Sequence, residues 1–177
     1  MTFAFGHIIG AWIVGKLYER VRNENISHYT WFFLLFGGIF PDIDFILDWA
    51  LGTQIHRTIT HSLLFILGSA LLMYVFFTLY DNFKTSHKKE NCQFALAFGA
   101  GMITHITIDF FSLQGVPLLW PSPLYFSVFG IGGYDSATSL LGGSVDILKA
   151  KVKLAVVDMA LGTAWILYLW WRKRIKF

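Results

Sequence analysis

The amino-acid sequence predicts an all-α, polytopic integral membrane protein with about five transmembrane helices. Of its 177 residues, 55% are hydrophobic and only 14% are charged, whereas soluble domains carry about 25% charged residues. The mean hydropathy is +0.57. Apolar residues also fall in long blocks, which is typical of helices that cross a bilayer in about 20 residues. The length suits one domain, residues 1–177.

The five predicted spans are Phe3–Leu17, Trp31–Leu51, Leu63–Tyr80, Phe94–Leu113 and Leu154–Trp171. Only the third contains neither a charged residue nor a proline. The second is interrupted by Gly37, Gly38 and Pro41, which favours a broken helix. A long outer excursion, Gln114–Lys153, separates the fourth span from the fifth and ends in a short amphipathic piece near Ser144.

Lysine and arginine gather after the first, third and fifth blocks, whereas residues 114–137 contain neither. The positive-inside rule then predicts a protein of the cytoplasmic (inner) membrane with its N-terminus out and its C-terminus in. Lys149, Lys151 and Lys153 are exceptions. This orientation places the unusual polar residues near the outer face. The lipid bilayer is the expected partner, and no basic-aromatic groove indicates nucleic-acid binding.

The fourth block carries His105 and Asp109 in the segment HITID. Residues four apart share one face of a helix, so the two side chains can bind one ion or pair with each other. An imidazole and a carboxylate suit Zn²⁺, with Mn²⁺ or Fe as alternatives. A hydrogen-bonded pair that only ties helices together is the other interpretation.

Two further carboxylates, Asp42 and Asp44, flank Ile43 in the second block. At this spacing they point in roughly opposite directions on a helix, so one is expected to bind an ion and the other to orient a ligand histidine. Which of the two binds stays open. The alternative, a charge that favours a helix N-terminus after Pro41, explains only one of them.

The densest polar segment is HRTITHS, residues 56–62. His56 and His61 each offer an imidazole, and either one is a candidate ligand. The Arg57 guanidinium matches a phosphate or carboxylate with two parallel hydrogen bonds. Thr60 and Ser62 are suited to cap the helix that follows. The alternative for the whole segment is a solvated polar loop.

A single histidine such as His7 would most often be a packing residue. His7 is nevertheless a further candidate ligand, because it is expected on the outer side of the membrane at the same depth as the other candidates. Asp158 is a weak candidate in the fifth block. The sequence contains no GxSxG, CxxC, HExxH or glycine-rich phosphate loop. Catalysis is therefore expected to use water activated by a metal ion.

The order of these motifs resembles that of the YdjM-like inner-membrane proteins, described as membrane-bound, metal-dependent hydrolases. The matching residues are His7, Gly37, Gly38, Pro41, Asp42, Asp44, His56, Arg57, Thr60, His61, Ser62, His105, Asp109 and Leu118 to Pro121. This resemblance covers most of the chain and implies a helical membrane protein with a metal-dependent hydrolytic activity.

A more distant resemblance links the pattern to zinc-dependent phospholipase C and P1-type nuclease. It implies that Asp109 bridges two metals and that His7 helps to hold one of them. Asp42 or Asp44, His56 or His61, and His105 would hold the other. No histidine follows His105, so the ligands of a third metal are absent, and one or two ions are expected.

The expected function is hydrolysis of a phosphoester, on a lipid or membrane-proximal substrate, with Arg57, Asp44 and His61 as catalytic residues. Zinc is the first choice of ion. A metal-ion transporter or sensor that uses the same ligands is the alternative, because transporters place such sites at broken helices. A structural His–Asp network without metal is the third interpretation.

Overall fold

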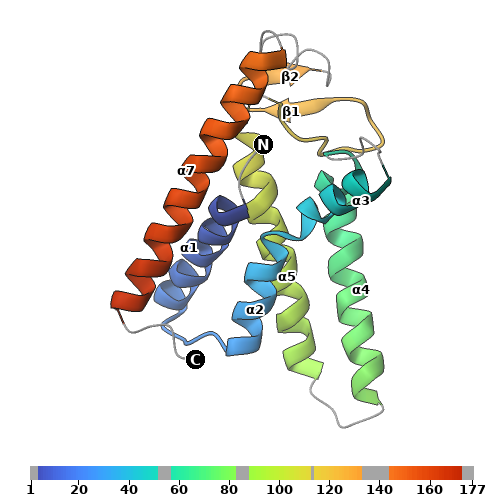
Figure 1. Ribbon diagram of the computed structural model, residues 1–177. Coiled ribbons are helices and arrows are strands. Elements are labelled where there is room, and N and C mark those ends of the chain that lie inside the picture. Colours follow the sequence, from blue (N-terminus) through green and yellow to red (C-terminus); the bar gives the residue numbers. More distant parts are fainter. Residues whose placement is uncertain (1–3, 52–56, 83–87, 113, 133–143, 173–177) are drawn as a thin grey trace.

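Six α-helices and a small hairpin make up the described part of the chain in this computed structural model (Figure 1). The structure describes residues 4–51, 57–82, 88–112, 114–132 and 144–172. The helices are α1 (Ala4–Arg22), α2 (His28–Gly37), α3 (Asp44–Leu51), α4 (Leu63–Asn82), α5 (Lys88–Phe110) and α7 (Ser144–Trp171). Two 3₁₀ turns, η1 (Phe40–Ile43) and η2 (Ile59–His61), and strands β1 (Tyr125–Ser127) and β2 (Gly130–Gly132) complete the fold.

Helix α5 lies at the centre, and α1, α2 and α4 all pack against it (Figure 1). Helix α7 packs on α1 along one side of the molecule. The core of buried residues joins α4 and α5 to the segment after α5: Ile66, Phe98, Met102, Ile106 and Val116. Phenylalanines from α2 and η1 stack onto this core, with Phe36 and Phe40 lying against Phe98.

Helices α2 and α5 approach so closely that glycine is needed on both. A Cβ atom at Gly37 would lie 2.2 Å from the Phe98 carbonyl oxygen, and one at Gly101 would lie 2.2 Å from the Leu34 carbonyl oxygen. Real Cβ atoms do not tolerate such contacts with backbone. The two backbones therefore touch, and this contact brings the end of α2 against the middle of α5.

The second apolar block is two helical segments with a sharp bend between them. Helix α2 starts at the Ser27 cap, whose hydroxyl accepts from the Thr30 N–H, and ends at Gly37. Pro41 occupies the first turn of η1, where its missing N–H has no helical partner to lose. The segments His28–Gly37 and Phe40–Ile46 are bent by 56°. The bend places Asp42 beside His105 of α5 and Asp44 beside Thr60.

The segment after α5 contains the hairpin, which corrects the expectation of an all-helical fold. Strands β1 and β2 are antiparallel, and Tyr125 lies opposite Gly132. Val116 and Phe126 exchange both backbone hydrogen bonds at 2.9 Å, which ties the hairpin to the end of α5. The predicted amphipathic piece near Ser144 is the start of α7.

The expectation of about five transmembrane helices is wrong for this structure. Among the described residues, only Leu63–Tyr80 of α4, with a mean hydropathy of 2.2, is long and apolar enough to cross a membrane. The bent pair α2 and Phe40–Ile46 adds a second span if it counts as one. The apolar part of α7, Ala155–Trp171, is shorter than a span. The mean hydropathy of helix α1 is lowered by four charged residues in its second half: Lys16, Glu19, Arg20 and Arg22.

Candidate metal centre

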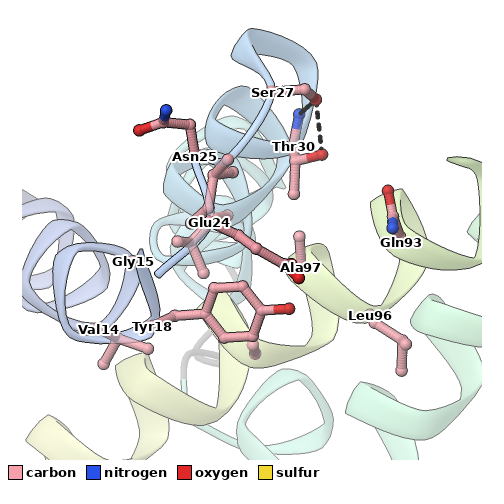
Figure 2. Close-up of a pocket in the computed structure, with 13 residues that line it drawn as sticks. Val14, Gly15, Tyr18, Glu24, Asn25, Ser27, Thr30, Gln93, Leu96 and Ala97 are labelled. Atoms are coloured by element: carbon pink, nitrogen blue, oxygen red, sulfur yellow. Dashed lines mark hydrogen bonds between the residues drawn. The ribbon is translucent and has the colours of Figure 1, made fainter. Parts of the chain in front are cut away.

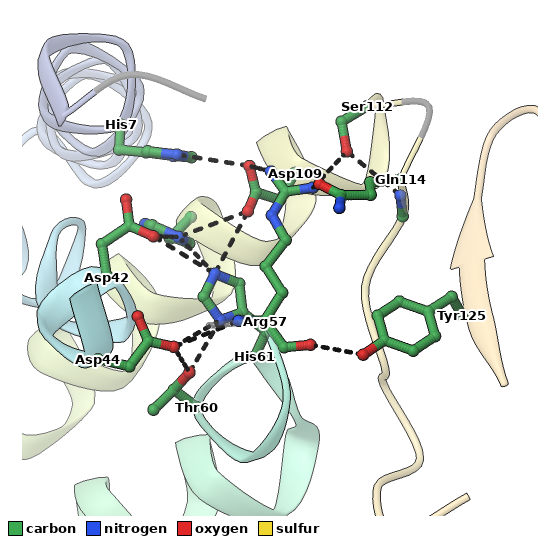
Figure 3. A network of polar contacts seen from close by, with 12 residues as sticks. His7, Asp42, Asp44, Arg57, Thr60, His61, Asp109, Ser112, Gln114 and Tyr125 are labelled. Carbon is green, nitrogen blue, oxygen red and sulfur yellow. Dashed lines mark hydrogen bonds and ion pairs between the residues drawn. The ribbon is translucent and has the colours of Figure 1, made fainter. Parts of the chain in front are cut away.

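A cluster of buried histidines and carboxylates lies where α1, η1, η2 and α5 meet (Figure 3). We call it the His–Asp cluster, and its members are His7, Asp42, His61, His105 and Asp109. Four of these residues are fully shielded from solvent, with 0% exposure, whereas the Asp42 side chain is 19% exposed. Burial of so many ionisable groups is unfavourable unless a partner compensates their charge.

His105 is oriented by the backbone at the end of α2. Its Nδ1 lies 2.8 Å from the Gly38 carbonyl oxygen, 67 residues earlier in the chain. A carbonyl oxygen only accepts, so Nδ1 carries the proton of the neutral ring. The lone pair is then on Nε2, which faces the other members of the cluster.

His61 is oriented in the same way by a chain of two hydrogen bonds. The Thr60 hydroxyl donates to Asp44 Oδ2 at 2.5 Å, and the Thr60 Oγ1 atom lies 2.9 Å from His61 Nδ1. A hydroxyl has one proton, so Thr60 accepts from His61. Asp44, which also accepts from the Arg57 N–H, therefore places a lone pair on His61 Nε2 through Thr60.

The two Nε2 atoms lie 3.2 Å apart, and carboxylates approach both of them. Asp42 Oδ1 is 3.5 Å from His61 Nε2 and 3.4 Å from His105 Nε2. Asp109 Oδ2 is 3.3 Å from His61 Nε2 and 3.8 Å from His105 Nε2. All four atoms accept when the histidines are neutral, and acceptors alone repel. A cation among them resolves this arrangement, and the donor set suits a transition metal.

His7 extends the cluster on the side of α1. Its ring stacks on His105 with centroids 3.6 Å apart and an interplanar angle of 17°. Its Nε2 lies 3.5 Å from Asp109 Oδ1. Asp109 Oδ1 also contacts the Arg57 guanidinium and Oδ2 contacts His61, so ion pairs rather than backbone groups surround this carboxylate. Two sets of residues could each hold an ion: His7, Asp42 and His105, and His61, His105 and Asp109.

The protonation of the cluster follows from its burial and charges. Burial, reinforced by neighbouring His105, lowers the pKa of His7 to about 3, so this ring is neutral near pH 7. Burial alone would lower the pKa of His61, but Asp109 and Asp42 outweigh it and raise that pKa. Burial would raise the pKa of Asp109, but His61 and Arg57 lower it. A proton and a metal ion would therefore compete for His61 Nε2.

Arg57 connects the cluster to the segments around it and is 1% exposed. Its Nη2 lies 3.0 Å from Asp109 Oδ1, and its Nη1 donates to Ser112 at 2.9 Å. Its backbone carbonyl accepts from the Tyr125 hydroxyl at 2.9 Å, as Figure 3 shows. The backbone φ of +60° is uncommon for a residue with a side chain. The guanidinium thus contacts the carboxylate of the cluster directly.

The structure brings five of the predicted ligands together and places Asp44 behind them. His56 lies outside the described residues. Sequence reasoning missed the contributions of Gly38, Ser112 and Tyr125, and treated Thr60 only as a helix cap. The glycine pair before Pro41 was the one available signal for Gly38, because a broken helix end exposes its carbonyl groups.

Asp158, a weak candidate in the sequence, anchors the start of α1 from α7. Its carboxylate accepts from the Gly6 N–H at 2.8 Å and the Phe5 N–H at 3.2 Å, and the residue is 6% exposed. These are the free N–H groups of a helix start. Because His7 follows directly, Asp158 holds this histidine at its level in the cluster.

Replacing Asp158 with alanine should destabilise the protein by about 0.5–2 kcal/mol, as loss of a helix cap does. It should also weaken metal binding through the displacement of His7. Thermal unfolding in detergent, with and without added metal, measures both effects. Val157→Ala on the exposed neighbouring position is the control, and equal behaviour of the two variants would contradict the anchoring role.

A separate cavity of about 290 Å³ lies near the end of α1 and the start of α2 and α5 (Figure 2). Its apolar lining includes Val14, Leu34 and Leu96, and its polar lining includes Glu24 and Gln93. No member of the His–Asp cluster lines it. The chemistry of the cluster is therefore independent of this cavity.

The fold and the site define a mostly helical protein with one described helix that could cross a membrane and a buried His–Asp cluster that could hold a metal ion. The chain belongs to the YdjM inner membrane protein family, whose model matches residues 1–175. This membership confirms the resemblance to the YdjM-like inner-membrane proteins. The metal-dependent hydrolytic activity and the similarity to phospholipase C and P1-type nuclease stay predictions. No curated protein and no solved structure matches the chain. The orientation with the N-terminus outside stays a prediction.

Proposed function

We propose that this protein is a metal-dependent hydrolase that cleaves a phosphoester. The observation that carries the proposal is the convergence of lone pairs from His61, His105, Asp42 and Asp109. Orienting contacts behind both histidines are typical of metal sites. These residues would hold a divalent ion, zinc first, which would supply Lewis-acid polarisation of the phosphoryl group and a bound water whose pKa is lowered towards neutrality.

The residues of the chain have distinct roles in this proposal. His7, Asp42, His61, His105 and Asp109 hold one or two ions. Asp44 and Thr60 keep His61 in the tautomer that presents Nε2. Arg57 keeps Asp109 in place, and its charge reduces the repulsion between the carboxylates and an incoming phosphate. Asp42 is the most exposed member, so water and substrate reach the cluster from its side.

A metal-ion transporter or sensor is the alternative, and the bend between Gly38 and Pro41 supports it. Transport requires polar groups that continue from the site through the protein. The described side chains one and two turns before His105 on α5 are Met102 and Phe98, and both are buried in an apolar core with Phe36 and Phe40. Because these apolar side chains offer an ion no polar path beyond the cluster, they favour the hydrolase over the transporter.

The test is hydrolysis of bis-p-nitrophenyl phosphate by detergent-purified protein, stripped with a chelator and reloaded with Zn²⁺, Mn²⁺ or Fe²⁺. Activity should return with metal in the wild type and in His28→Ala, which changes an exposed histidine, but not in His61→Ala. Stoichiometric metal without hydrolysis of any phosphoester would overturn the hydrolase and direct attention to ion flux in proteoliposomes.

Thr60 offers a sharper test of the orienting contacts. Thr60→Val keeps the shape of the side chain but removes the link between Asp44 and His61, so metal affinity should fall by about 10–100-fold. Thr60→Ser keeps the hydroxyl and should bind as the wild type does. Competition with a chromogenic chelator measures both affinities. Equal affinity of the valine and serine variants would contradict this role.

A further inference from the structure

We propose that α3 lies in the membrane interface, with one apolar face in contact with lipid acyl chains. This face consists of Ile43, Ile46 and Ala50, which are three and four residues apart and therefore share one side of the helical segment. All three residues are exposed, and Ile46 is exposed to 62%. We call this surface the α3 apolar face. The inference goes beyond the proposed function and does not depend on hydrolytic activity.

The polarity of α3 is opposite to that of a helix at a water surface. Asp44 is fully shielded and accepts from the Thr60 hydroxyl and the Arg57 N–H. Asp48, four residues later on the same side, is partly buried. A surface helix of a soluble protein instead buries its apolar side chains and exposes its charged ones. Because the isoleucines of α3 face outwards, the surroundings of this face are expected to be apolar.

The α3 apolar face continues into the exposed surface of the candidate span. The turn η1 contacts η2, and η2 contacts α4. Ile43 of η1, Ile59 of η2 and Leu63 of α4 are 42%, 46% and 45% exposed. Leu63 begins the stretch Leu63–Tyr80, only 6% of which is buried in the protein. In a member of an inner membrane protein family, acyl chains cover such a stretch, and continuity with it identifies the same partner for α3.

The same placement sets the depth of the His–Asp cluster. Leu63 marks the boundary of the hydrocarbon, and α3 lies at the same end of the molecule as the first turn of α4 (Figure 1). Interfacial helices bury their apolar face about 5–10 Å into this boundary. Asp42 directly precedes Ile43, and consecutive Cα atoms are about 3.8 Å apart. The exposed edge of the cluster therefore lies at the level of the lipid headgroups.

The depth of α3 can be measured with nitroxide labels on single cysteines in phosphatidylglycerol–phosphatidylethanolamine nanodiscs. The exposed Cys92 is first replaced by serine. Ile46→Cys reports on the α3 apolar face, Leu67→Cys on the exposed side of α4, and Glu24→Cys on the exposed loop after α1. Collision rates are measured with oxygen, which concentrates in hydrocarbon, and with a water-soluble nickel chelate.

The label at position 46 should behave like the label at position 67. Its collisions with oxygen should be frequent, and its collisions with the nickel chelate should be several-fold rarer than those at position 24. Equal nickel collisions at positions 46 and 24 would place α3 in water and overturn the proposal. Rare collisions with both reagents would show that protein covers the face, and spin–spin coupling would identify a second copy of this chain. Either of these results would also overturn the contact with lipid.

A substitution tests the same contact without a label. Ile46→Gln should lower the midpoint of thermal unfolding in nanodiscs, because hydrocarbon leaves the amide without hydrogen-bond partners. At a water surface the same change would be neutral or slightly stabilising, since glutamine favours helices more than isoleucine does. Ile46→Leu, which stays apolar, is the control. An unchanged midpoint for Ile46→Gln would contradict the proposal, and neither measurement involves turnover, so the hydrolase can fail without affecting this result.

Discussion

Replacing Asp109 with asparagine should abolish metal binding while preserving the shape of the side chain. Asp109 contacts His7, His61, His105 and Arg57. Its carboxylate therefore contacts all three histidines of the cluster. An amide cannot supply the negative charge that offsets a divalent ion. The loss should exceed the about 10–100-fold typical of residues that only orient ligands.

The measurement is metal content by plasma mass spectrometry on detergent-purified protein. The wild type and Glu24→Gln, a carboxylate outside the cluster, should retain one or two equivalents that Asp109→Asn lacks. Asp109→Ala should also be unstable, because the buried Arg57 guanidinium would lose the carboxylate that it contacts, and breaking a buried ion pair costs about 3–5 kcal/mol. Metal retained in Asp109→Asn would exclude Asp109 as a ligand. If no variant contained metal, even after metal was added, the metal site would be excluded and a structural polar network would be the remaining interpretation.

The largest effect on folding is expected for Gly101→Ala. A Cβ atom at this position would lie 2.2 Å from the Leu34 carbonyl oxygen and 2.7 Å from the Gly38 nitrogen. Both are backbone atoms, so α2 and α5 must separate. The expected destabilisation is at or above the upper end of the about 1–3 kcal/mol typical of overpacking. The Gly38 carbonyl would also move away from His105 Nδ1.

Gly99→Ala is a matched control two residues earlier on α5. Its Cβ would lie 3.5 Å from Ala70, an ordinary contact, and alanine favours helices by about 1 kcal/mol over glycine. Thermal unfolding in detergent should therefore show Gly101→Ala well below the wild type and Gly99→Ala at or above it. Similar midpoints for the two variants would contradict the close contact between helices.

The local parts of the site could be predicted because they depend on short spacings. His105 and Asp109 share a face of α5, as residues four apart do. Asp42 and Asp44 point to different partners because η1 ends between them. Gly37, Gly38 and Pro41 had predicted that the backbone is irregular there. The contact between Gly101 and Leu34 gave no signal, since a glycine inside an apolar helix has no pattern that reveals its neighbour.

The number of spans was wrong for a different reason. Each apolar block was counted as one span, including the second, for which an interruption was expected. The second block bends by 56°, and the first carries charges in its helical continuation. The hairpin was missed because its strands are three residues long, too short for an alternating pattern. Tyr125 could not be linked to Arg57 from the sequence, because no short spacing connects them.

The order of the cluster residues along the chain also determines when during synthesis the proposed site can form. Its parts are distant in the chain: Gly38 and His105 are 67 residues apart, and His61 and His105 are 44 apart. A nascent chain that ends before α5 has neither His105 nor Asp109 and lacks the surface on which α1, α2 and α4 assemble. In the proposed function, the full set of ligands would therefore exist only after α5 has been made, and binding of an ion would then stabilise the folded protein over shorter chains that lack α5.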